Sequence, residues 1–316
     1  MMSLTRSFLE ARGAIEVETP MFHPIPGGAN ARPFTTHHNA LDLDLYLRVA
    51  PELYLKRLTV AGFEKVFEIG RVFRNEGVST RHNPEFTMLE LYEAYADYED
   101  IMQLVEELVE YLAVELTGST ILKIDDQELD VARPWRRATM VELIEEAIGT
   151  TLSLDTPLDE LRAVAADHEV PIKESYGPGK LILEIYEKTT ESALWGPVYV
   201  TDYPIEVSPL SREHRSEAGM TERFEAILAG RELCNGFSEL IDPEQQRLRF
   251  EEQAAQNASG DDEAMLVDED YLRALEYGLP PTGGVGIGMD RLAMLLTGTT
   301  SIRDVVLFPT LRPEQN

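Results

Sequence analysis

Cysteine is nearly absent from this chain of 316 residues, in which Cys234 stands alone. A single thiol excludes an internal disulfide and any metal site built from a cluster of cysteines. No apolar run approaches the roughly 18 residues of a membrane-spanning helix, and the N-terminal residues lack the apolar stretch of a secretory signal peptide. We therefore expect no membrane contact and a location in the reducing cytoplasm.

Positive charge is also scarce. The 28 Lys and Arg residues stand against 57 Asp and Glu residues, which gives a formal net charge of −29. The average field of such a surface repels a polyanion such as tRNA, although a local basic patch can still bind one. Two interpretations of this acidity remain open. It reflects a bias of the source genome or adaptation to salty surroundings, or the chain does not bind RNA.

Residue alternation predicts the strands, and capping residues predict the ends of the helices. The predicted strands cover about residues 13–20, 44–49, 65–73, 85–95, 121–131, 198–201, 223–228 and 232–240. The predicted helices cover about residues 4–11, 51–62, 97–118, 158–168, 180–194, 243–257 and 261–277, with short helices starting at Thr139 and ending at Leu296. Antiparallel strand pairs with segregated helices indicate an α+β fold. The block at about 135–195 carries no obvious chemistry and is interpreted as a helical insertion.

Two of these strands carry residues suited to chemistry. Phe86, Met88, Glu90 and Tyr92 alternate along one strand, so their side chains share a face. A phenyl ring can stack on a base, and a carboxylate with a phenol can bind an ammonium group. Arg74 on the partner strand can clamp a carboxylate or an α-phosphate. The alternative is an amphipathic hairpin whose charges face water.

A second hairpin places Glu225 and Glu232 on either side of a turn at Ala229-Gly230. Two close carboxylates repel each other unless a cation or a proton joins them. Magnesium prefers oxygen ligands and commonly bridges substrate phosphates. The alternative is a pair of exposed glutamates in a very acidic protein.

Six segments together resemble the catalytic domain of class II lysyl-tRNA synthetases. They are Glu16–Pro20, Pro26–Pro33, Ala50–Arg57, Arg71–Tyr92, Gly230–Leu240 and Gly284–Arg291. The resemblance implies the class II synthetase catalytic fold over residues 1–316, an antiparallel sheet flanked by helices, and a homodimer. It implies an ATP-dependent ligase that activates L-lysine and passes the lysyl group to lysine tRNA.

The resemblance also assigns roles to individual residues. ATP is expected to contact Arg74, Glu76, His82, Asn83, Phe86, Glu225, Glu232 and Arg291. Lysine is expected to contact Gly28, Glu52, Glu90, Tyr92, Asn235, Phe237 and Glu239. Arg74 and Arg291 are the expected catalytic residues, and Glu225 and Glu232 are the expected magnesium ligands. The alternative for Glu52 and Glu90 is ion pairing with Lys56 or Arg57.

The sequence departs from the family pattern in two ways. It begins about ten residues before the strand expected at 13–20, so we expect no anticodon-binding OB-fold within it. The sequence then belongs either to a trimmed enzyme or to a free-standing paralogue. Such a paralogue could lysylate another acceptor, such as elongation factor P. A third hypothesis is a non-catalytic protein that binds lysine or a nucleotide. Cys234 stands where related enzymes have a small residue, and it either narrows the pocket or packs as a small hydrophobic residue.

Overall fold

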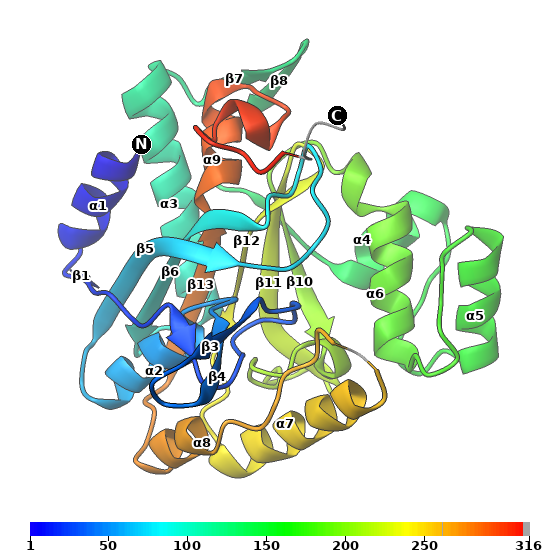
Figure 1. Cartoon of the computed structure of the whole chain (residues 1–316). Coiled ribbons are helices and arrows are strands. Elements are labelled where there is room, and N and C mark those ends of the chain that lie inside the picture. Colours follow the sequence, from blue (N-terminus) through cyan, green and yellow to red (C-terminus); the bar gives the residue numbers. More distant parts are fainter. Residues whose placement is uncertain (261, 312–316) are drawn as a thin grey trace, which may run out of the picture.

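The fold is built on an eight-stranded sheet, which a computed structural model describes for residues 1–260 and 262–311 (Figure 1). The strands follow the order β1-β5-β6-β13-β12-β11-β10-β9. Their bounds are Ile15–Glu16 for β1, Lys65–Phe73 for β5, Glu85–Ala94 for β6, Arg136–Thr139 for β9, Val198–Pro204 for β10, Met220–Leu228 for β11, Arg231–Ser238 for β12 and Thr282–Gly288 for β13. The α+β fold class is confirmed.

The sheet is antiparallel only in its interior. Every pair from β5 to β10 is antiparallel, whereas β1 pairs with β5, and β9 with β10, in parallel. The expectation of antiparallel pairs throughout was therefore wrong at both edges. Parallel neighbours need a long crossover connection, and the helices between β9 and β10 supply one.

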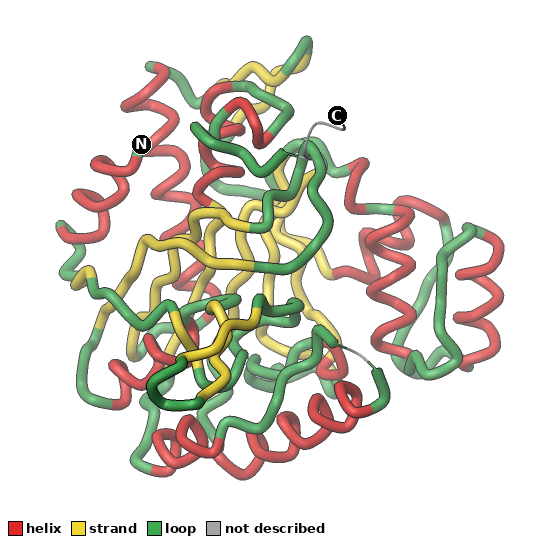
Figure 2. The backbone as a smooth tube through the Cα atoms, viewed as in Figure 1, coloured by secondary structure: helices red, strands yellow, loops and turns green. Residues whose placement is uncertain are grey.

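Helices surround the sheet, as the red segments at the periphery of Figure 2 show. Their bounds are Met2–Glu10 for α1, Glu52–Val60 for α2, Tyr98–Thr117 for α3, Met140–Ile148 for α4, Leu158–Asp167 for α5, Pro178–Thr189 for α6, Pro243–Ala258 for α7, Glu269–Glu276 for α8 and Met289–Thr297 for α9. Short 3₁₀ turns are η1 Glu191–Ala193, η2 Ile205–Val207 and η3 Ile302–Asp304. Two small sheets hold β2 Phe22–His23, β3 Thr35–His38 and β4 Leu43–Leu47, and β7 Ile121–Ile124 and β8 Gln127–Asp130. Among the described residues, no helix combines the length and apolar character needed to cross a bilayer.

The ends of α3 and α4 follow directly from the sequence. Asp97 accepts hydrogen bonds from the first turn of α3, and Gly118 ends that helix with φ 79°. Thr139 and Glu142 form the expected capping box at the start of α4. The buried face of α3 carries Ile101, Val105 and Leu108 into the main core, so this helix fixes one side of the sheet.

The block at 135–195 begins with a strand and continues as helices. Its first residues form β9, and α4, α5 and α6 then pack beside the β10–β9 edge of the sheet (Figure 1). Their buried apolar residues, such as Leu181 and Ile185, form a second core cluster with Val200 of β10. The strand was missed because Arg136–Thr139 is too short and polar to alternate clearly.

Two other local predictions were wrong. The strand expected at 13–20 pairs only at Ile15–Glu16. The helix expected at 261–277 begins at Glu269, because the Asp268 side chain caps it by accepting from the Tyr271 backbone N–H. Asp261, where that prediction started, lies outside the described residues.

Candidate active site

One cavity of about 400 Å³ gathers nearly all the residues that the sequence singled out. It is lined by Gly28, Glu52, Arg74, Glu76, His82, Asn83, Phe86, Glu90, Tyr92, Glu225, Glu232, Asn235, Phe237 and Arg291. Its floor is the face of β6, β11, β12 and β13, so strands that are neighbours in space bring together segments more than 130 residues apart in sequence. The predicted row Phe86, Met88, Glu90 and Tyr92 faces it throughout.

One end of this cavity is acidic. The Tyr92 hydroxyl donates to Glu90 Oε2 at 2.9 Å, and both side chains are buried. Burial, with the neighbouring Glu52 carboxylate, raises the pKa of Glu90 to about 8. Glu52 is the first residue of α2, and burial raises its pKa although the nearby Lys56 ammonium opposes the shift. Carboxyl groups held this way are poised to receive a cation.

Lys56 lies beneath that acidic end. Its Nζ donates to Glu52 Oε1 at 2.5 Å and forms a second ion pair with Glu239 Oε2. The alternative of a Glu52–Lys56 ion pair is therefore present in the structure. Glu239 is the candidate that does not line the cavity: its side chain is completely buried behind Gly284.

Gly28 lies against the start of α2. Its φ is +90°, and a Cβ there would lie 3.0 Å from Glu52 Cβ and 3.2 Å from Ala50 Cβ. A side chain would meet both strain and crowding at this position. Glycine therefore lets the backbone of the 26–33 segment approach the acidic end closely.

The opposite end of the cavity carries two arginines. Arg74 follows β5, and its guanidinium lies 5.3 Å from the centre of the Phe86 ring. Within the described residues Arg74 Nε is buried without a hydrogen-bond partner, and burial lowers the pKa of the guanidinium. Arg291, on α9, pairs with Glu232 Oε2 at 2.8 Å and lies 3.4 Å from His82 Nε2. A buried donor with no partner favours an anionic ligand here.

The loop between β5 and β6 forms the rim of this end. His82 hydrogen-bonds to Ser79, and burial with the nearby Arg291 charge lowers its pKa. Asn83 donates to Glu85 O at 2.6 Å and accepts from Thr310 N at 3.1 Å. The nitrogen and the oxygen of the Asn83 side-chain amide therefore both hydrogen-bond to backbone groups, although the residue lines the cavity. Glu76 lines it as well, and its backbone N–H donates to Arg74 O.

Glu225 and Glu232 reach the cavity from β11 and β12. The strand register pairs Glu225 with Asn235 and Glu232 with Ile227, so the two carboxylates are offset by a bulge rather than directly opposed. Burial and Glu232 raise the pKa of Glu225 to about 7, whereas Arg291 holds the pKa of the partly exposed Glu232 below its usual range.

Arg223 is a cavity residue that the sequence analysis missed. Its guanidinium donates to Glu225 Oε1 at 2.6 Å and to Asn235 Oδ1 at 3.2 Å. It therefore fixes one expected metal ligand and one expected substrate contact. The signal was the alternation of Arg223 with Glu225, which places both on one face of β11.

Cys234 points away from this chemistry. It is 1% exposed, belongs to the main apolar core and alternates with Asn235 on β12. Burial raises the pKa of its thiol. The structure thus favours the small buried hydrophobic residue over a residue that narrows the pocket.

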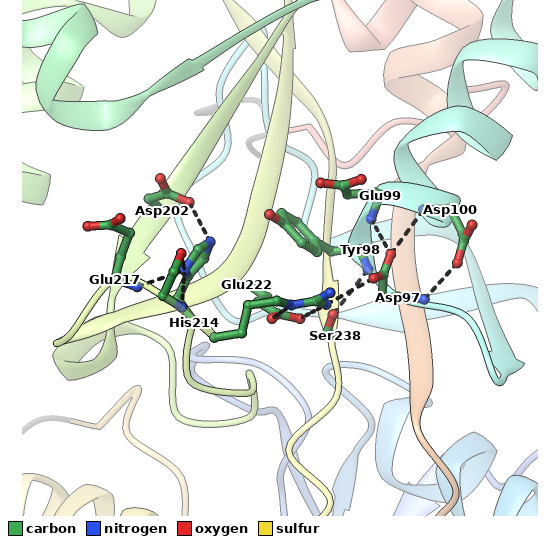
Figure 3. A network of polar contacts seen from close by, with 11 residues as sticks. Asp97, Tyr98, Glu99, Asp100, Asp202, His214, Glu217, Glu222 and Ser238 are labelled. Carbon is green, nitrogen blue, oxygen red and sulfur yellow. Dashed lines mark hydrogen bonds and ion pairs between the residues drawn. The ribbon is translucent and has the colours of Figure 1, made fainter.

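A polar network joins the start of α3 to β11 and β12 (Figure 3). The residues that follow the cavity segment 207–211 pair with the same two strands. Arg215 donates to both oxygens of Glu222, at 2.5 and 2.9 Å, and to Asp97 at 2.9 Å. Tyr98 N donates to Ser238 Oγ at 3.1 Å. The network ties the start of α3 to the strands that carry the cavity.

Comparison with known proteins agrees with this geometry. The family model described as tRNA synthetases class II (D, K and N) matches residues 1–312. The chain is 59% identical over 310 residues to a lysine–tRNA ligase of Xanthomonas oryzae pv. oryzae, covering 98% of this chain and 61% of the relative. It is 55% identical to the enzyme of that name from Moorella thermoacetica over 98% of this chain and 63% of the relative.

The lysine–tRNA ligase of Bacillus subtilis is 54% identical over 307 residues, which are 97% of this chain and 62% of the relative. The chain thus spans about three fifths of the length of these relatives. The matched family model, the α+β sheet and the convergence of the expected residues all agree. The chain belongs to the class II tRNA synthetases of the D, K and N group.

Proposed function

We propose that this chain is the catalytic domain of a lysine–tRNA ligase, which activates L-lysine with ATP and transfers the lysyl group to lysine tRNA. The observation that carries the proposal is one cavity lined both by the buried carboxylates of Glu52 and Glu90 and by the guanidinium groups of Arg74 and Arg291. A cationic amino acid fits the first pair, and a polyphosphate fits the second. The names of the relatives support lysine as the amino acid.

The lysine end of the proposed site uses six cavity residues. Glu52 and Glu90 bind the two ammonium groups, with the Tyr92 hydroxyl and the Gly28 backbone beside them. Asn235 hydrogen-bonds to the substrate carboxylate, and Phe237 packs on the aliphatic stem. A substrate without the side-chain ammonium group leaves buried carboxylates unmatched, which such a site penalises strongly. Glu239 contributes from behind the cavity.

The ATP end uses the two arginines and the ring of Phe86. Phe86 stacks on the adenine, and Arg74 contacts the α-phosphate through the donor that lacks a protein partner. Arg291 and His82 lie close enough together to share the outer phosphates. Glu76 and Asn83 shape the rim that closes over the nucleotide. The arginine forks suit phosphate oxygens geometrically as well as electrostatically.

Glu225 and Glu232 fit a magnesium ion carried in with ATP. Each pairs with an arginine through one oxygen, Glu225 with Arg223 and Glu232 with Arg291, which leaves the second oxygen of each carboxylate for a metal. Within the described residues no group of three or more His, Cys, Asp or Glu side chains could hold a metal. Two carboxylates suit magnesium, which takes phosphate oxygens and water as its other ligands. When bound, the ion neutralises phosphate charge.

The proposed reaction needs positioning more than acid–base chemistry. The lysine carboxylate, already an anion, attacks the α-phosphorus in line, and pyrophosphate leaves with the electron pair of the broken P–O bond. Arg74 stabilises charge at the α-phosphate, and Arg291 stabilises it on the leaving group. Fixed charges in a cavity shielded from water are the main source of such catalysis. The adenylate then passes its lysyl group to the acceptor. A location in the cytoplasm is part of the proposal.

A homodimer is part of the proposal. Ile15, Met21, Phe22, Leu41 and Leu43 are between 43% and 67% exposed, and all come from β1, β2, β4 and their connections. We take these exposed apolar side chains as the candidate contact surface with a second copy of the chain. Sedimentation should therefore give twice the mass of one chain.

ATP–pyrophosphate exchange with single amino acids tests the proposal. Exchange should depend on lysine and on magnesium, and tRNA charging should follow in the same preparation. Exchange with a different amino acid, or none with any, contradicts lysine activation. Lysine-dependent exchange with no charging of tRNA favours a different acceptor, such as elongation factor P, while lysine binding without exchange favours a non-catalytic protein.

A further inference from the structure

A second, smaller cavity adjoins the main cavity. Its volume is about 100 Å³, and Glu232, Leu233 and Arg291 line both cavities. β7 and α9, which lie together at the top of Figure 1, supply part of its remaining wall. The proposed reaction so far assigns no role to this space.

Arg231 brings a positive charge into the second cavity. It is the first residue of β12 and lines this cavity but not the main one. Within the described residues its guanidinium forms no ion pair and no hydrogen bond. Burial, followed by the charges of Arg81 and Arg291, lowers the pKa of Arg231, whereas Asp125 opposes the shift. A partly buried cation beside two other cations is poorly matched until an anion joins it.

The loop that carries Arg81 is fixed near the junction of the two cavities. Arg81 lines the main cavity, and its guanidinium also lacks an ion pair or hydrogen bond in the described part of the chain. Thr80 O accepts a hydrogen bond from Ile302 N at 2.8 Å, which ties the loop to the segment after α9. That segment contributes Thr300 to the second cavity. A second cation without a partner therefore lies near the junction.

Carboxylates also lie in this region. Those that act on Arg231 or Arg291 are Asp125, Glu191, Glu225 and Glu232. Glu225 and Glu232 are the proposed magnesium ligands, and each is already paired with an arginine. A magnesium ion that arrives with a phosphate ligand offsets these two carboxylates. Arg81 and Arg231 then remain free to bind the phosphate oxygens.

Pyrophosphate is the anion that the proposed reaction releases at this point. It leaves with the electron pair of the broken P–O bond, so it carries one more negative charge than the same two phosphates carry in ATP. Leu228, Met294 and Leu295 form an apolar wall of the second cavity. Charges attract each other more strongly beside such a wall than in open water, and the arginine fork matches phosphate oxygens.

We propose that the second cavity is a subsite for pyrophosphate, where Arg231, together with Arg81 and Arg291, binds the leaving group after it separates from the adenylate. The inference rests on the proposed function. It gives Arg231 no contact with bound ATP, because Arg231 lies outside the main cavity. In the reverse reaction the same subsite is where pyrophosphate first binds.

The KM for pyrophosphate in ATP–pyrophosphate exchange tests the inference. Arg231→Met keeps the apolar stem and removes the charge, so this KM should rise at least about fivefold, while the KM values for ATP and lysine change by less than about twofold. Arg231→Lys keeps a point charge without the planar fork and should give an intermediate KM.

Arg137→Met is the matched control, because it changes the net charge by the same amount. Arg137 lies on β9 and lines neither cavity, so this variant should keep the wild-type KM for pyrophosphate. A rise of equal size in Arg137→Met and Arg231→Met would contradict the inference, since the average field of the protein would then explain both.

Calorimetry measures the same contact without turnover. Magnesium pyrophosphate should bind to the ATP-free wild-type protein, and the Kd should be at least about fivefold higher for Arg231→Met, which lacks one charge-assisted contact. Added salt should weaken binding to the wild type more than to Arg231→Met, because the variant has one cation fewer to be screened. A purely structural role for Arg231 predicts no such difference in salt dependence.

The outcomes separate the inference from the proposed function. Exchange that depends on another amino acid contradicts lysine activation, whereas the KM and Kd for pyrophosphate still decide the inference. Wild-type values of both constants in Arg231→Met overturn the inference alone. Equal rises in the KM for ATP and for pyrophosphate also overturn it, because Arg231 would then contact bound ATP. A rise confined to the KM for tRNA in charging overturns it in favour of a tRNA phosphate. If Arg231→Met does not fold, Arg231→Gln serves for the same measurements.

Discussion

Arg291 holds Glu232 at two points, because its Nη1 lies 2.8 Å from both the backbone carbonyl and the carboxylate Oε2 of that residue. The two residues are 59 positions apart and lie on α9 and β12. Although burial opposes its charge, the Glu232 contact raises the pKa of Arg291 above its ordinary value. The guanidinium is therefore fixed in direction before any nucleotide arrives.

That fixed direction makes Arg291→Lys a damaging substitution. Lysine keeps the charge but loses the planar fork, so it cannot hold Glu232 and a phosphate together. We expect the rate of lysine-dependent ATP–pyrophosphate exchange to fall by about 10²–10³-fold, the usual cost of one charge-stabilising donor. Arg247→Lys is the control, because Arg247 forms an exposed two-point pair with Glu269 on α7 and α8. Equal rates in the two variants would contradict the role of Arg291.

Gly284 makes a second prediction possible. A Cβ at this position would overlap Glu239 Oε1 and lie 2.5 Å from Tyr92 Cε1, and both neighbours are buried. Gly284→Ala should therefore lower the free energy of unfolding by about 1–3 kcal/mol and raise the KM for lysine. Urea denaturation and exchange kinetics measure the two effects.

Gly286 on the same strand is the matched control for stability. A Cβ there would meet Met88 Sδ at 3.5 Å and Glu90 Cγ at 3.7 Å, which are ordinary contacts. The Gly286→Ala variant should unfold at the wild-type urea concentration or slightly above it, because alanine costs less backbone entropy than glycine. A common loss of stability in both variants would mean that crowding at Glu239 is not the cause.

The hairpin of β5 and β6 could be predicted almost to the residue. Strong alternation and a polar loop predicted strands at 65–73 and 85–95. The observed strands are Lys65–Phe73 and Glu85–Ala94. The same alternation placed Phe86, Met88, Glu90 and Tyr92 on the cavity face, because local backbone geometry alone decides which way strand residues point.

The position of Glu239 could not be predicted in this way. It continues the row of Asn235 and Phe237, but β12 ends at Ser238 and the carboxylate pairs with a lysine 183 positions earlier. Likewise, Asp268 stops α8 from extending back toward 261 through a capping bond that competes with helix propensity. Both outcomes depend on contacts or competing local bonds that a periodicity count does not contain.

Glu90 should make the protein less stable as the pH rises. Its carboxyl ionises near 4.5 in an ordinary setting and at about 8 in the folded protein, because of burial and Glu52. The unfolded chain therefore gives up this proton first, and stability is lost between these two pH values by up to about 1.4 kcal/mol per pH unit. Glu90→Gln removes that loss, so calorimetry should show a gain in Tm that is larger at pH 8 than at pH 5.

Glu93→Gln provides the comparison for this prediction. Glu93 lies on the same strand and pairs with Lys65 at 2.6 Å in a partly exposed position. Its amide variant loses an ion pair and should gain no stability at either pH. Glu90→Gln should at the same time weaken lysine binding, since it removes one of the two carboxylates proposed to bind the ammonium groups of lysine. A Tm gain of equal size at pH 5 and pH 8 would show that the Glu90 charge is not responsible.

Arg215 should matter for stability although it is 55% exposed, because the Glu222 side chain that it pairs with is completely buried. Arg215→Ala leaves that carboxylate without its main cation, which should cost about 3 kcal/mol of unfolding free energy. Arg247→Ala breaks an exposed pair of similar geometry and should lower the stability far less, because water screens that pair. Adding Glu222→Gln to Arg215→Ala should recover part of the loss in urea denaturation. Equal losses for the two arginine variants would show that burial of Glu222 does not set the value of this contact.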